Sequence, residues 1–377
     1  MKSKVIIFTA STGHGHNQVA LAMKNELVAQ GCEVSIYEPF KEVSKSLDIL
    51  LSDGYRVLAT KMPKFYGRIY KMSNQQFLGK PVEIFSVKVI EDKLEEIVDH
   101  VQPDLIISTH PLIVKAMCSL KRKSKYLGPF VSVITDYMPH KCYISPIVDA
   151  YIVGSQYTKL KVIEKGISEN RVFVYGIPIH RSFRECDNKM EKSNQFTVLL
   201  MGGSMGLSGI KKVFKELLNI HAPIKIIVVC GNNMTLKKYL EERYLSQVSN
   251  KDITILGFTN EISQYMEVSD VIVTKPGGLT VTEAFAKNIP IIIPFYIPGQ
   301  EEENAEMLID MGVAVKVGGP KELGTLIESF IQEPNLLNHL KRNMYKVSID
   351  HSLDDAINLC IKFIESQNDD IGIKYAK

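Results

Sequence analysis

The amino-acid sequence predicts an α/β protein with two doubly wound, Rossmann-like domains that face each other across a cleft. Short apolar runs alternate with longer helical segments, which is typical of a parallel sheet with helices on both faces. A polar stretch at residues 189–194 interrupts this alternation, and the pattern then begins again. With 377 residues, the chain is long enough for roughly two domains. Domains of this kind bind their ligands beyond the carboxyl ends of the strands.

The first predicted domain comprises residues 1–185. Its first strand is the apolar run KVIIFTA at 4–10, and a helix follows at 17–31, where Gly31 ends it. Further strands, with helical segments between them, are predicted at residues 32–40, 103–111, 130–136 and 150–155.

The second predicted domain comprises residues 190–350 and repeats this order. Its strands are predicted at residues 196–206, 225–231, 253–258, 271–278, 290–295 and 314–317. A helix is expected at 352–365 after the last of them. The final residues, 366–377, have the polar character of a frayed terminus.

The composition is that of a globular protein, with 45% apolar and 23% charged residues. No apolar run approaches the roughly 18 residues that a membrane-spanning helix needs, and the first apolar run leads into a Gly/His loop rather than a signal-peptide cleavage site. The cysteines are far apart, so we expect them to be reduced and structural in a cytoplasmic protein. Residues 1–190 are net basic and residues 191–377 net acidic, which suggests that one half faces an anionic partner.

Three glycine-rich loops follow predicted strands and open helices: STGHGH at 11–16, GGSMG at 202–206 and KPGG at 275–278. Glycine lets a ligand approach the backbone, and the free N–H groups of a helix's first turn attract anions. The P-loop pattern is absent, and STGHGH departs from the dinucleotide pattern at Gln18. Each loop alone is equally well explained as a tight turn, but the two in the second half together favour phosphate binding there.

Thr280 and Glu283 lie on the first turns of the helix that follows KPGG. One interpretation is capping, since a carboxylate near a helix N-terminus stabilises the helix dipole by about 0.3–1 kcal/mol. The other is that Glu283 accepts hydrogen bonds from two ribose hydroxyls while the glycines bind a diphosphate. Position alone favours neither.

Four blocks of sequence resemble a known family: GHGHNQVA (13–20), VITDYMPH (133–140), YGIPIHRSF (175–183) and TKPGGLTVTEAFAKNIPIIIPFYIPGQEEENA (274–305). On these motifs the chain resembles the family 28 glycosyltransferases of GT-B fold, and most closely the processive diacylglycerol glucosyltransferases and the monogalactosyldiacylglycerol synthases. The likeness spans nearly the whole chain. It implies that the final helix, within 352–377, packs back onto the first domain.

The resemblance implies an inverting transfer from a UDP-sugar that the second domain binds. Gly257 and Phe258 would meet the uracil, and Glu283 the ribose hydroxyls. Gln300 and Glu301 would hydrogen-bond the sugar. The diphosphate would be surrounded by a set of loop residues: Gly203, Ser204, Gly206, Pro276, Gly277, Gly278 and Leu279. Because the sequence contains no D-x-D motif, no metal or other cofactor is expected, and backbone N–H groups would stabilise the leaving UDP.

An inverting transfer needs a base beside the acceptor hydroxyl. His16 ends the first glycine-rich loop, and an ordinary histidine pKa of about 6.5 suits that role; the alternative is a structural histidine that caps the helix. Asp136, at the end of the predicted strand 130–136, is the second candidate, either as the base itself or by orienting His16. His110 follows another strand and is predicted to line the acceptor site, although a structural role fits it equally.

Residues 55–80 form a segment rich in basic and aromatic residues and free of acidic ones. A solvated basic face is the default interpretation, and nucleic-acid binding is disfavoured because no recognition motif accompanies the segment. Cations interleaved with aromatic rings suit an anionic membrane surface better. The residues assigned to this acceptor and membrane surface are Arg56, Lys61, Lys64, Phe65, Tyr66, Arg68 and Tyr70.

The sequence therefore predicts an enzyme, peripherally bound to the inner face of the cell membrane, that moves glucose from UDP-glucose to 1,2-diacylglycerol. Whether it repeats the step on its product is left open. Three alternatives remain: UDP-galactose as the donor, a polyprenyl-linked or soluble acceptor, and a non-catalytic regulator that senses a UDP-sugar. No nucleic-acid partner is expected, and the oligomeric state is not predicted.

Overall fold

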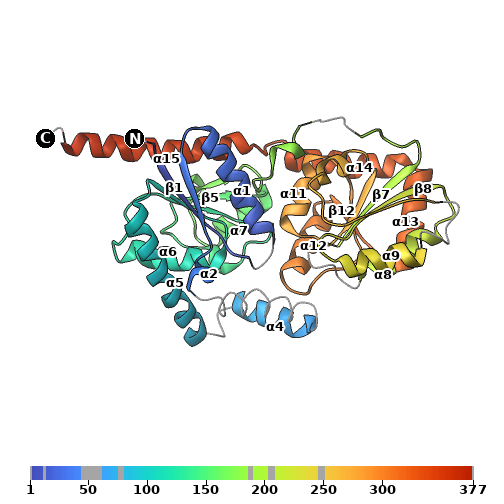
Figure 1. The fold of residues 1–377 in the computed structure, drawn as a ribbon, viewed down its shortest axis with the longest axis horizontal. Coiled ribbons are helices and arrows are strands. Elements are labelled where there is room, and N and C mark those ends of the chain that lie inside the picture. The colour runs from blue at the N-terminus through green and yellow to red at the C-terminus, as the bar shows by residue number, and fades with distance from the viewer. Residues whose placement is uncertain are drawn as a thin grey trace. The chain divides into compact units, whose positions relative to one another are not determined.

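The computed structural model describes residues 2–11, 14–43, 62–74, 80–185, 190–202, 209–244 and 251–375. The chain divides into two compact units, each with a six-stranded sheet (Figure 1). The first unit comprises residues 1–180 and 350–377, and the second comprises residues 181–349. The chain therefore leaves the first unit slightly before residue 185, where the sequence analysis ended the first domain.

The first sheet has the strand order β2-β1-β3-β4-β5-β6, and all its strands pair in parallel. The strands are β1 (Lys4–Phe8), β2 (Glu33–Tyr37), β3 (Leu105–Ser108), β4 (Phe130–Val133), β5 (Ala150–Val153) and β6 (Val172–Val174). All but β6 fall within the predicted apolar runs. β6 is an edge strand of three residues, too short for a periodic pattern to identify it.

Helices surround this sheet and bury its apolar faces. They are α1 (His14–Ala29), α2 (Pro39–Val43), α4 (Pro63–Asn74), α5 (Lys80–Val101), α6 (Pro111–Arg122), α7 (Gln156–Glu164) and α15 (Leu353–Tyr375), with short 3-10 helices at Lys141–Tyr143 and Glu169–Arg171. One core forms where side chains such as Phe8 and Phe130 of the sheet pack with Leu94 of α5 and Met117 of α6. α15 contacts α1 and β3, and it continues to Tyr375, so the expected fraying of residues 366–377 is wrong for most of that stretch.

The second sheet has the order β12-β11-β10-β7-β8-β9 and is also parallel. Its strands are β7 (Phe196–Met201), β8 (Ile224–Val229), β9 (Asp252–Leu256), β10 (Val271–Thr274), β11 (Ile291–Ile293) and β12 (Ala314–Lys316). Each overlaps a predicted strand. The helices are α8 (Gly209–Asn219), α9 (Met234–Tyr244), α10 (Ile262–Glu267), α11 (Gly278–Ala286), α12 (Gln300–Asp310), α13 (Pro320–Gln332) and α14 (Pro334–Ser348), after a 3-10 turn at Arg181–Phe183.

The strand order reverses direction once in each sheet. In the first unit the reversal lies between β1 and β3, and in the second it lies between β7 and β10. Connections on the two sides of such a point leave in opposite directions, so ligands of doubly wound folds bind there, beyond the carboxyl ends of the strands. Residues 9–11, 109–110 and 275–277 follow the strands that flank these two places.

The return of the chain into the first unit is held by a buried histidine. His351 donates from Nε2 to the main-chain oxygen of Gly154 at 2.8 Å, and the Ser352 N–H donates to Tyr175 at 2.9 Å. Gly176 lies against the His351 ring in a left-handed conformation, with φ of 79°. A Cβ on Gly176 would lie 2.6 Å from Cγ of that ring, so glycine is required at this position.

We expect Gly176→Ala to lower the free energy of unfolding of the protein. Backbone strain alone costs about 1–3 kcal/mol, and the clash with the His351 ring adds to this. Thermal unfolding measures the effect. Gly166→Ala is the matched control, because Gly166 has φ of 92° but no atom within 4 Å of an added Cβ. Equal melting temperatures for the two variants would show that packing against His351 does not constrain Gly176.

Candidate functional site

His16 lies at the point where the first sheet reverses its strand order. It stands in the first turn of α1, and its ring Nδ1 is 2.8 Å from the main-chain oxygen of Thr109, which follows β3. The same nitrogen is 3.0 Å from Oγ1 of Thr135, just beyond β4. The predicted base is therefore held at the carboxyl edge of the sheet by residues that follow two other strands.

These contacts set the tautomer of His16. A main-chain oxygen can only accept a hydrogen bond, so Nδ1 carries the proton of the neutral ring and Nε2 carries the lone pair. The Tyr143 hydroxyl donates to the same Thr109 oxygen at 3.1 Å and lies 3.0 Å from Thr135 Oγ1. Burial lowers the pKa of His16 to about 4, against the opposing effect of its bond to Thr109. The ring is therefore neutral at pH 7, in the form that can accept a proton at Nε2.

His110 packs directly against His16. Their ring centroids are 5.0 Å apart with the rings at 73°, and Phe40 of α2 packs against His110 at 5.6 Å. Burial, and then the proximity of His16, hold the pKa of His110 well below its usual range. His110 thus lies at the predicted edge as a buried neutral ring, and its contact with an acceptor stays a prediction.

Asp136 lies at the same edge, beyond β4, and is buried. Burial of Tyr143, and then the charge of Asp136, raise the pKa of the Tyr143 hydroxyl well above its usual value. The contacts described above orient the His16 ring through Thr109 and Thr135. The sequence analysis identified neither residue, although Thr135 lies in the block VITDYMPH, because a threonine in a motif or strand does not show which side chain it contacts. The role of Asp136 as an alternative base stays a prediction.

α4 carries the described part of the predicted membrane segment, and one of its faces is anchored to the unit. Tyr66 and Tyr70 pack with ring centroids 6.3 Å apart, and Tyr70 lies 5.1 Å from the ring of His140. His140 in turn accepts from the Cys142 N–H at 3.2 Å. Tyr70 therefore contacts the rest of the unit with Tyr66 packed beside it, and both side chains are half-buried.

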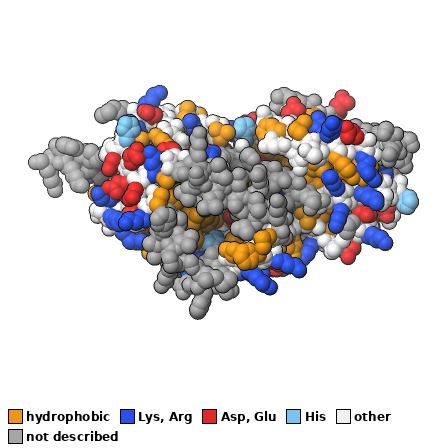
Figure 2. Space-filling model, turned by 60° about the horizontal axis from the view of Figure 1, so that its bottom comes forward, with side chains coloured by type: hydrophobic (Ala, Val, Ile, Leu, Met, Phe, Trp, Pro, Cys, Tyr) orange, Lys and Arg blue, Asp and Glu red, His pale blue; other side chains and the backbone are white. Residues whose placement is uncertain are grey.

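The other face of α4 combines apolar and basic side chains. Phe65 is 50% exposed and Ile69 is 42% exposed, and both are flanked by the exposed cations Lys64 and Arg68. Figure 2 shows hydrophobic side chains beside Lys and Arg on the face of the molecule that carries α4. Arg56 and Lys61, assigned to the same surface, lie outside the described residues.

In the second unit, the loop after β10 leads into the start of α11. Gly277 caps α11 and Gly278 is its first residue, so the N–H groups of Gly278 and Leu279 have no partner within the helix. The carbonyl of Pro276 accepts from Asn304 Nδ2 at 3.1 Å, which holds the loop in place. No atom lies within 4 Å of a Cβ built on Gly277, so a ligand can approach this backbone. Gly203, Ser204 and Gly206, the other predicted diphosphate residues, lie outside the described residues.

Glu283 lies in the second turn of α11, and the first turn contains no acidic residue. The capping interpretation is therefore unsuitable, because dipole effects fall off within the first turn. Burial raises the pKa of Glu283 to about 8, so the carboxyl is largely protonated at neutral pH in the absence of a ligand. Hydrogen-bond donors such as ribose hydroxyls would favour its charged form.

Glu301 ties the end of β10 to the start of α12. One carboxylate oxygen pairs with Lys275 and the other accepts from the Ile297 N–H at 2.9 Å. Glu301 is buried in this arrangement, whereas Gln300, the first residue of α12, is half-buried. Glu301 thus has a structural role that the sequence analysis missed, and the contact of either residue with a sugar stays a prediction.

Gly257 and Phe258 follow β9 at the carboxyl edge of the second sheet. Phe258 is 67% exposed, and Met234 at the start of α9 is 61% exposed. A Cβ on Gly257 would lie 3.5 Å from the sulfur of Met234, so the glycine and the methionine are neighbours. Exposed apolar side chains of this kind offer a surface that a planar base can cover.

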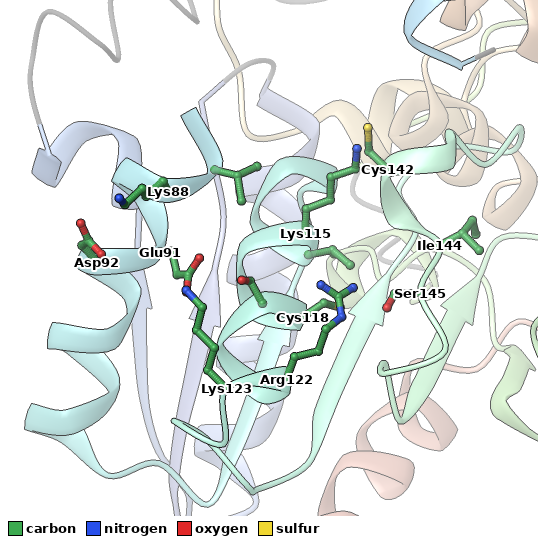
Figure 3. Close-up of a pocket in the computed structure, with 13 residues that line it drawn as sticks. Lys88, Glu91, Asp92, Lys115, Cys118, Arg122, Lys123, Cys142, Ile144 and Ser145 are labelled. Atoms are coloured by element: carbon green, nitrogen blue, oxygen red, sulfur yellow. The ribbon is translucent and has the colours of Figure 1, made fainter. Parts of the chain in front are cut away.

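A separate cavity of about 480 Å³ lies between α5 and α6 (Figure 3). Lys88, Lys115 and Arg122 line it, and Glu91 pairs with Lys123 at its wall. None of the predicted site residues lines this cavity. It is therefore not the predicted acceptor site.

Neither a metal cluster nor a membrane span is found in the described part of the chain. No group of three or more His, Cys, Asp or Glu side chains there is arranged to hold a metal ion. None of the helices formed by those residues is both long and apolar enough to cross a bilayer.

Comparisons with known proteins cover nearly the whole chain. Residues 16–179 match the family described as monogalactosyldiacylglycerol (MGDG) synthase, and residues 197–357 match the glycosyltransferase family 28 C-terminal domain. The processive diacylglycerol beta-glucosyltransferase of Bacillus pumilus is 30% identical, covering 93% of this chain and 92% of that protein. The protein of the same name from Bacillus subtilis is also 30% identical over 93% of this chain and 92% of its own length.

Solved structures share the fold of this chain. MurG of Acinetobacter baumannii superposes with a TM-score of 0.64, covering 96% of this chain and 99% of its own, at 16% identity. At that identity the likeness shows a common fold.

We expect Glu283→Gln to stabilise the protein at high pH and to leave it unchanged at low pH. Between its unfolded pKa of 4.5 and its folded pKa of about 8, wild-type Glu283 keeps its proton in the folded state and loses it in the unfolded state. The stability of the wild type therefore falls as pH rises through this window, whereas the uncharged glutamine does not titrate. Melting temperatures from pH 5 to 9 test this, and parallel curves for the two proteins would contradict it.

Proposed function

Because the chain belongs to the processive diacylglycerol glucosyltransferase and monogalactosyldiacylglycerol synthase family of GT-B glycosyltransferases, we propose that it transfers glucose from UDP-glucose to 1,2-diacylglycerol. The observation that carries the proposal is the match to diacylglycerol glucosyltransferases along nearly the entire length of the chain. As the family is one of enzymes, the alternative of a non-catalytic UDP-sugar sensor is set aside.

The second unit is proposed to bind the UDP. N–H groups at the start of α11 suit the diphosphate, because they have no partner in the helix and the helix dipole favours an anion there. Glu283 is proposed to accept from the ribose hydroxyls, and Phe258 to contact the uracil. Such fixed donors would stabilise the charge that develops on the leaving UDP, without a metal ion.

The first unit is proposed to activate the acceptor. The oxygen of the diacylglycerol hydroxyl attacks the anomeric carbon as the bond from that carbon to the UDP oxygen breaks, and the hydroxyl proton passes to Nε2 of His16. The lone pair on Nε2 supports this role, because Nδ1–H is engaged by Thr109. Attack opposite the leaving group inverts the anomeric carbon. A processive enzyme would repeat the step on its glycolipid product.

UDP-galactose is the second candidate donor, since residues 16–179 match the family described as monogalactosyldiacylglycerol synthase. The deciding experiment supplies radiolabelled UDP-glucose or UDP-galactose to the protein with diacylglycerol vesicles and separates the lipids. A glucolipid supports the proposal and a galactolipid supports the second donor. UDP-sugar binding without any glycolipid, from a folded protein, would refute both.

We expect Glu283→Ala to weaken UDP binding by about 1–3 kcal/mol, the usual effect of losing hydrogen bonds to a charged group. Calorimetry measures it. UDP binding should also strengthen as pH rises toward about 8. The carboxylate form of Glu283 can accept hydrogen bonds from both ribose hydroxyls, whereas below that pH the Glu283 carboxyl of the ligand-free protein keeps its proton. Unchanged affinity in the variant would refute the ribose role.

We expect His16→Ala to lower turnover by about 10²–10⁴-fold while leaving UDP binding largely intact, because a base acts on the acceptor rather than on the donor. Steady-state rates of glycolipid formation and UDP calorimetry together measure the two effects. Near wild-type turnover in His16→Ala, with a large loss in Asp136→Asn, would assign the base to Asp136.

α4 is proposed to dock the protein on an anionic membrane surface, with Phe65 and Ile69 entering the interface between Lys64 and Arg68. We expect Phe65→Ser to weaken binding to phosphatidylglycerol vesicles about 10-fold or more, since burial of such a side chain contributes about 1.5–3 kcal/mol. Vesicle co-sedimentation measures the loss. Leu127→Ser is the control, because Leu127 is 79% exposed but lies before β4, at the amino end of the sheet. Equal binding by both variants would contradict a docking role for α4.

A further inference from the structure

A chain of hydrogen-bonded side chains crosses the carboxyl edge of the first sheet. Thr109 donates from its hydroxyl to Thr9 at 2.9 Å, and Thr9 donates to Asn17 Oδ1 at 2.8 Å. Asn17 Nδ2 donates to Ser11 at 3.0 Å, and Ser11 donates to the carboxylate of Glu38. The chain therefore links the ends of β3, β1 and β2 through a residue that is the direct neighbour of His16 in α1.

The charge of Glu38 fixes the direction of every bond in this chain. Two bonds from Lys41 and Ser11, together with the Asn17 amide, hold the pKa of Glu38 below its ordinary value although burial opposes them, so the carboxylate can only accept. The Ser11 hydroxyl has a single proton, which it donates in a hydrogen bond to Glu38. Ser11 must therefore accept from the amide nitrogen of Asn17. The amide oxygen then faces Thr9, and Thr9 in turn accepts from Thr109.

Asn17 closes the glycine-rich loop between its two ends. One side of its amide binds Thr9, at the end of β1, and the other binds Ser11, at the start of the loop. Thr9 and Thr109 are fully buried, and their main-chain N–H groups bind Tyr37 and Phe8, so both are rigid supports. The carbonyl of Thr109 is the acceptor of the Nδ1–H of His16.

We infer that Asn17 is a positioning residue that holds His16 against the Thr109 carbonyl and thereby keeps the lone pair on Nε2. The inference deepens the proposed function, since its catalytic consequence rests on His16 as the base. Its structural part, which concerns the tautomer of His16, can be tested without measuring enzymatic activity. A misplacement of about 1 Å at a reacting group can cost about 10²-fold in rate, so a side chain that touches no substrate can still govern turnover.

The test reverses the direction of the hydrogen bonds between Asn17, Ser11 and Glu38. Asn17→Asp places a second carboxylate beside Ser11, whose single proton cannot serve both acids, and the two charges repel. Combining Asn17→Asp with Glu38→Gln should restore the chain in reverse, because the glutamine amide donates to Ser11 and Ser11 donates to the aspartate. Asn25→Asp is the matched control, since Asn25 is exposed on the same helix and the variant adds the same charge.

Two readouts are needed for each folded variant. Nitrogen-15 chemical shifts of the His16 ring report which nitrogen is protonated, and steady-state rates with UDP-glucose and diacylglycerol vesicles give kcat and KM. We expect Asn17→Asp to mix the two tautomers and to lower kcat about 10²-fold with little change in the KM for UDP-glucose. The double variant should recover both readouts, and Asn25→Asp should match the wild type. If Asn17→Asp does not fold, Ser11→Ala breaks the same link without adding charge.

An unchanged His16 tautomer in Asn17→Asp, or a folded double variant that recovers neither readout, would overturn the inference. A shifted tautomer with wild-type kcat would overturn its catalytic part together with the assignment of His16 as the base. If the wild type forms no glycolipid at all, the proposed function fails, and the ring shifts alone still decide whether Asn17 positions His16.

Discussion

Parallel hydrogen bonding between β1 and β3 is the constraint on which the first unit depends. Val5 pairs with Leu105, and the two strands end at the same edge. His16 and the Thr109 carbonyl thereby come within 2.8 Å although 93 positions separate them in the chain. In the second unit β7 and β10 likewise pair in parallel and end at the same edge, with Val198 paired to Val271. In both sheets the strand order reverses between the two strands of this pair. The segments that follow these strands therefore leave the sheet at the edge where ligands of doubly wound folds bind.

Burial acts in opposite directions on the two ionisable residues that matter most. It lowers the pKa of His16 and raises the pKa of Glu283, and each residue is thereby held in its neutral form at pH 7 in the absence of ligand. The protonation state of each residue would also respond to a bound ligand. Donors from a ribose would favour the charged form of Glu283, and a nearby negative charge would favour protonated His16. The charges needed for the reaction therefore arise when the substrates are present.

Sequence reasoning found residues that carry a recognisable signal. His16 and Glu283 stand next to glycine-rich turns after apolar runs, and the structure has strands and helices at those places. It missed Thr109, Thr135 and Asn17, although Asn17 and Thr135 lie within the family-like blocks at 13–20 and 133–140, because an ordinary polar side chain does not show which partner it contacts. Thr135 contacts His16 across 119 positions and Thr109 contacts Thr9 across 100. Partners so far apart are known only when strand order and register are known. Glu301 lies in a block of sequence that resembles the glycosyltransferase family, and that resemblance predicted a contact with the sugar. In the structure its described contacts, with Lys275 and Ile297, are structural.

The sequence by itself determined the fold class, the two-domain order and the loops that could bind anions, because hydrophobic periodicity and glycine placement are local properties. The tertiary structure alone decided which nitrogen of His16 holds the proton and in which direction Asn17 points. It also decided that Glu283 is a half-buried acid with a raised pKa rather than a cap. Those outcomes depend on desolvation and on hydrogen-bond partners from other strands, and a chain has neither until its sheets have formed.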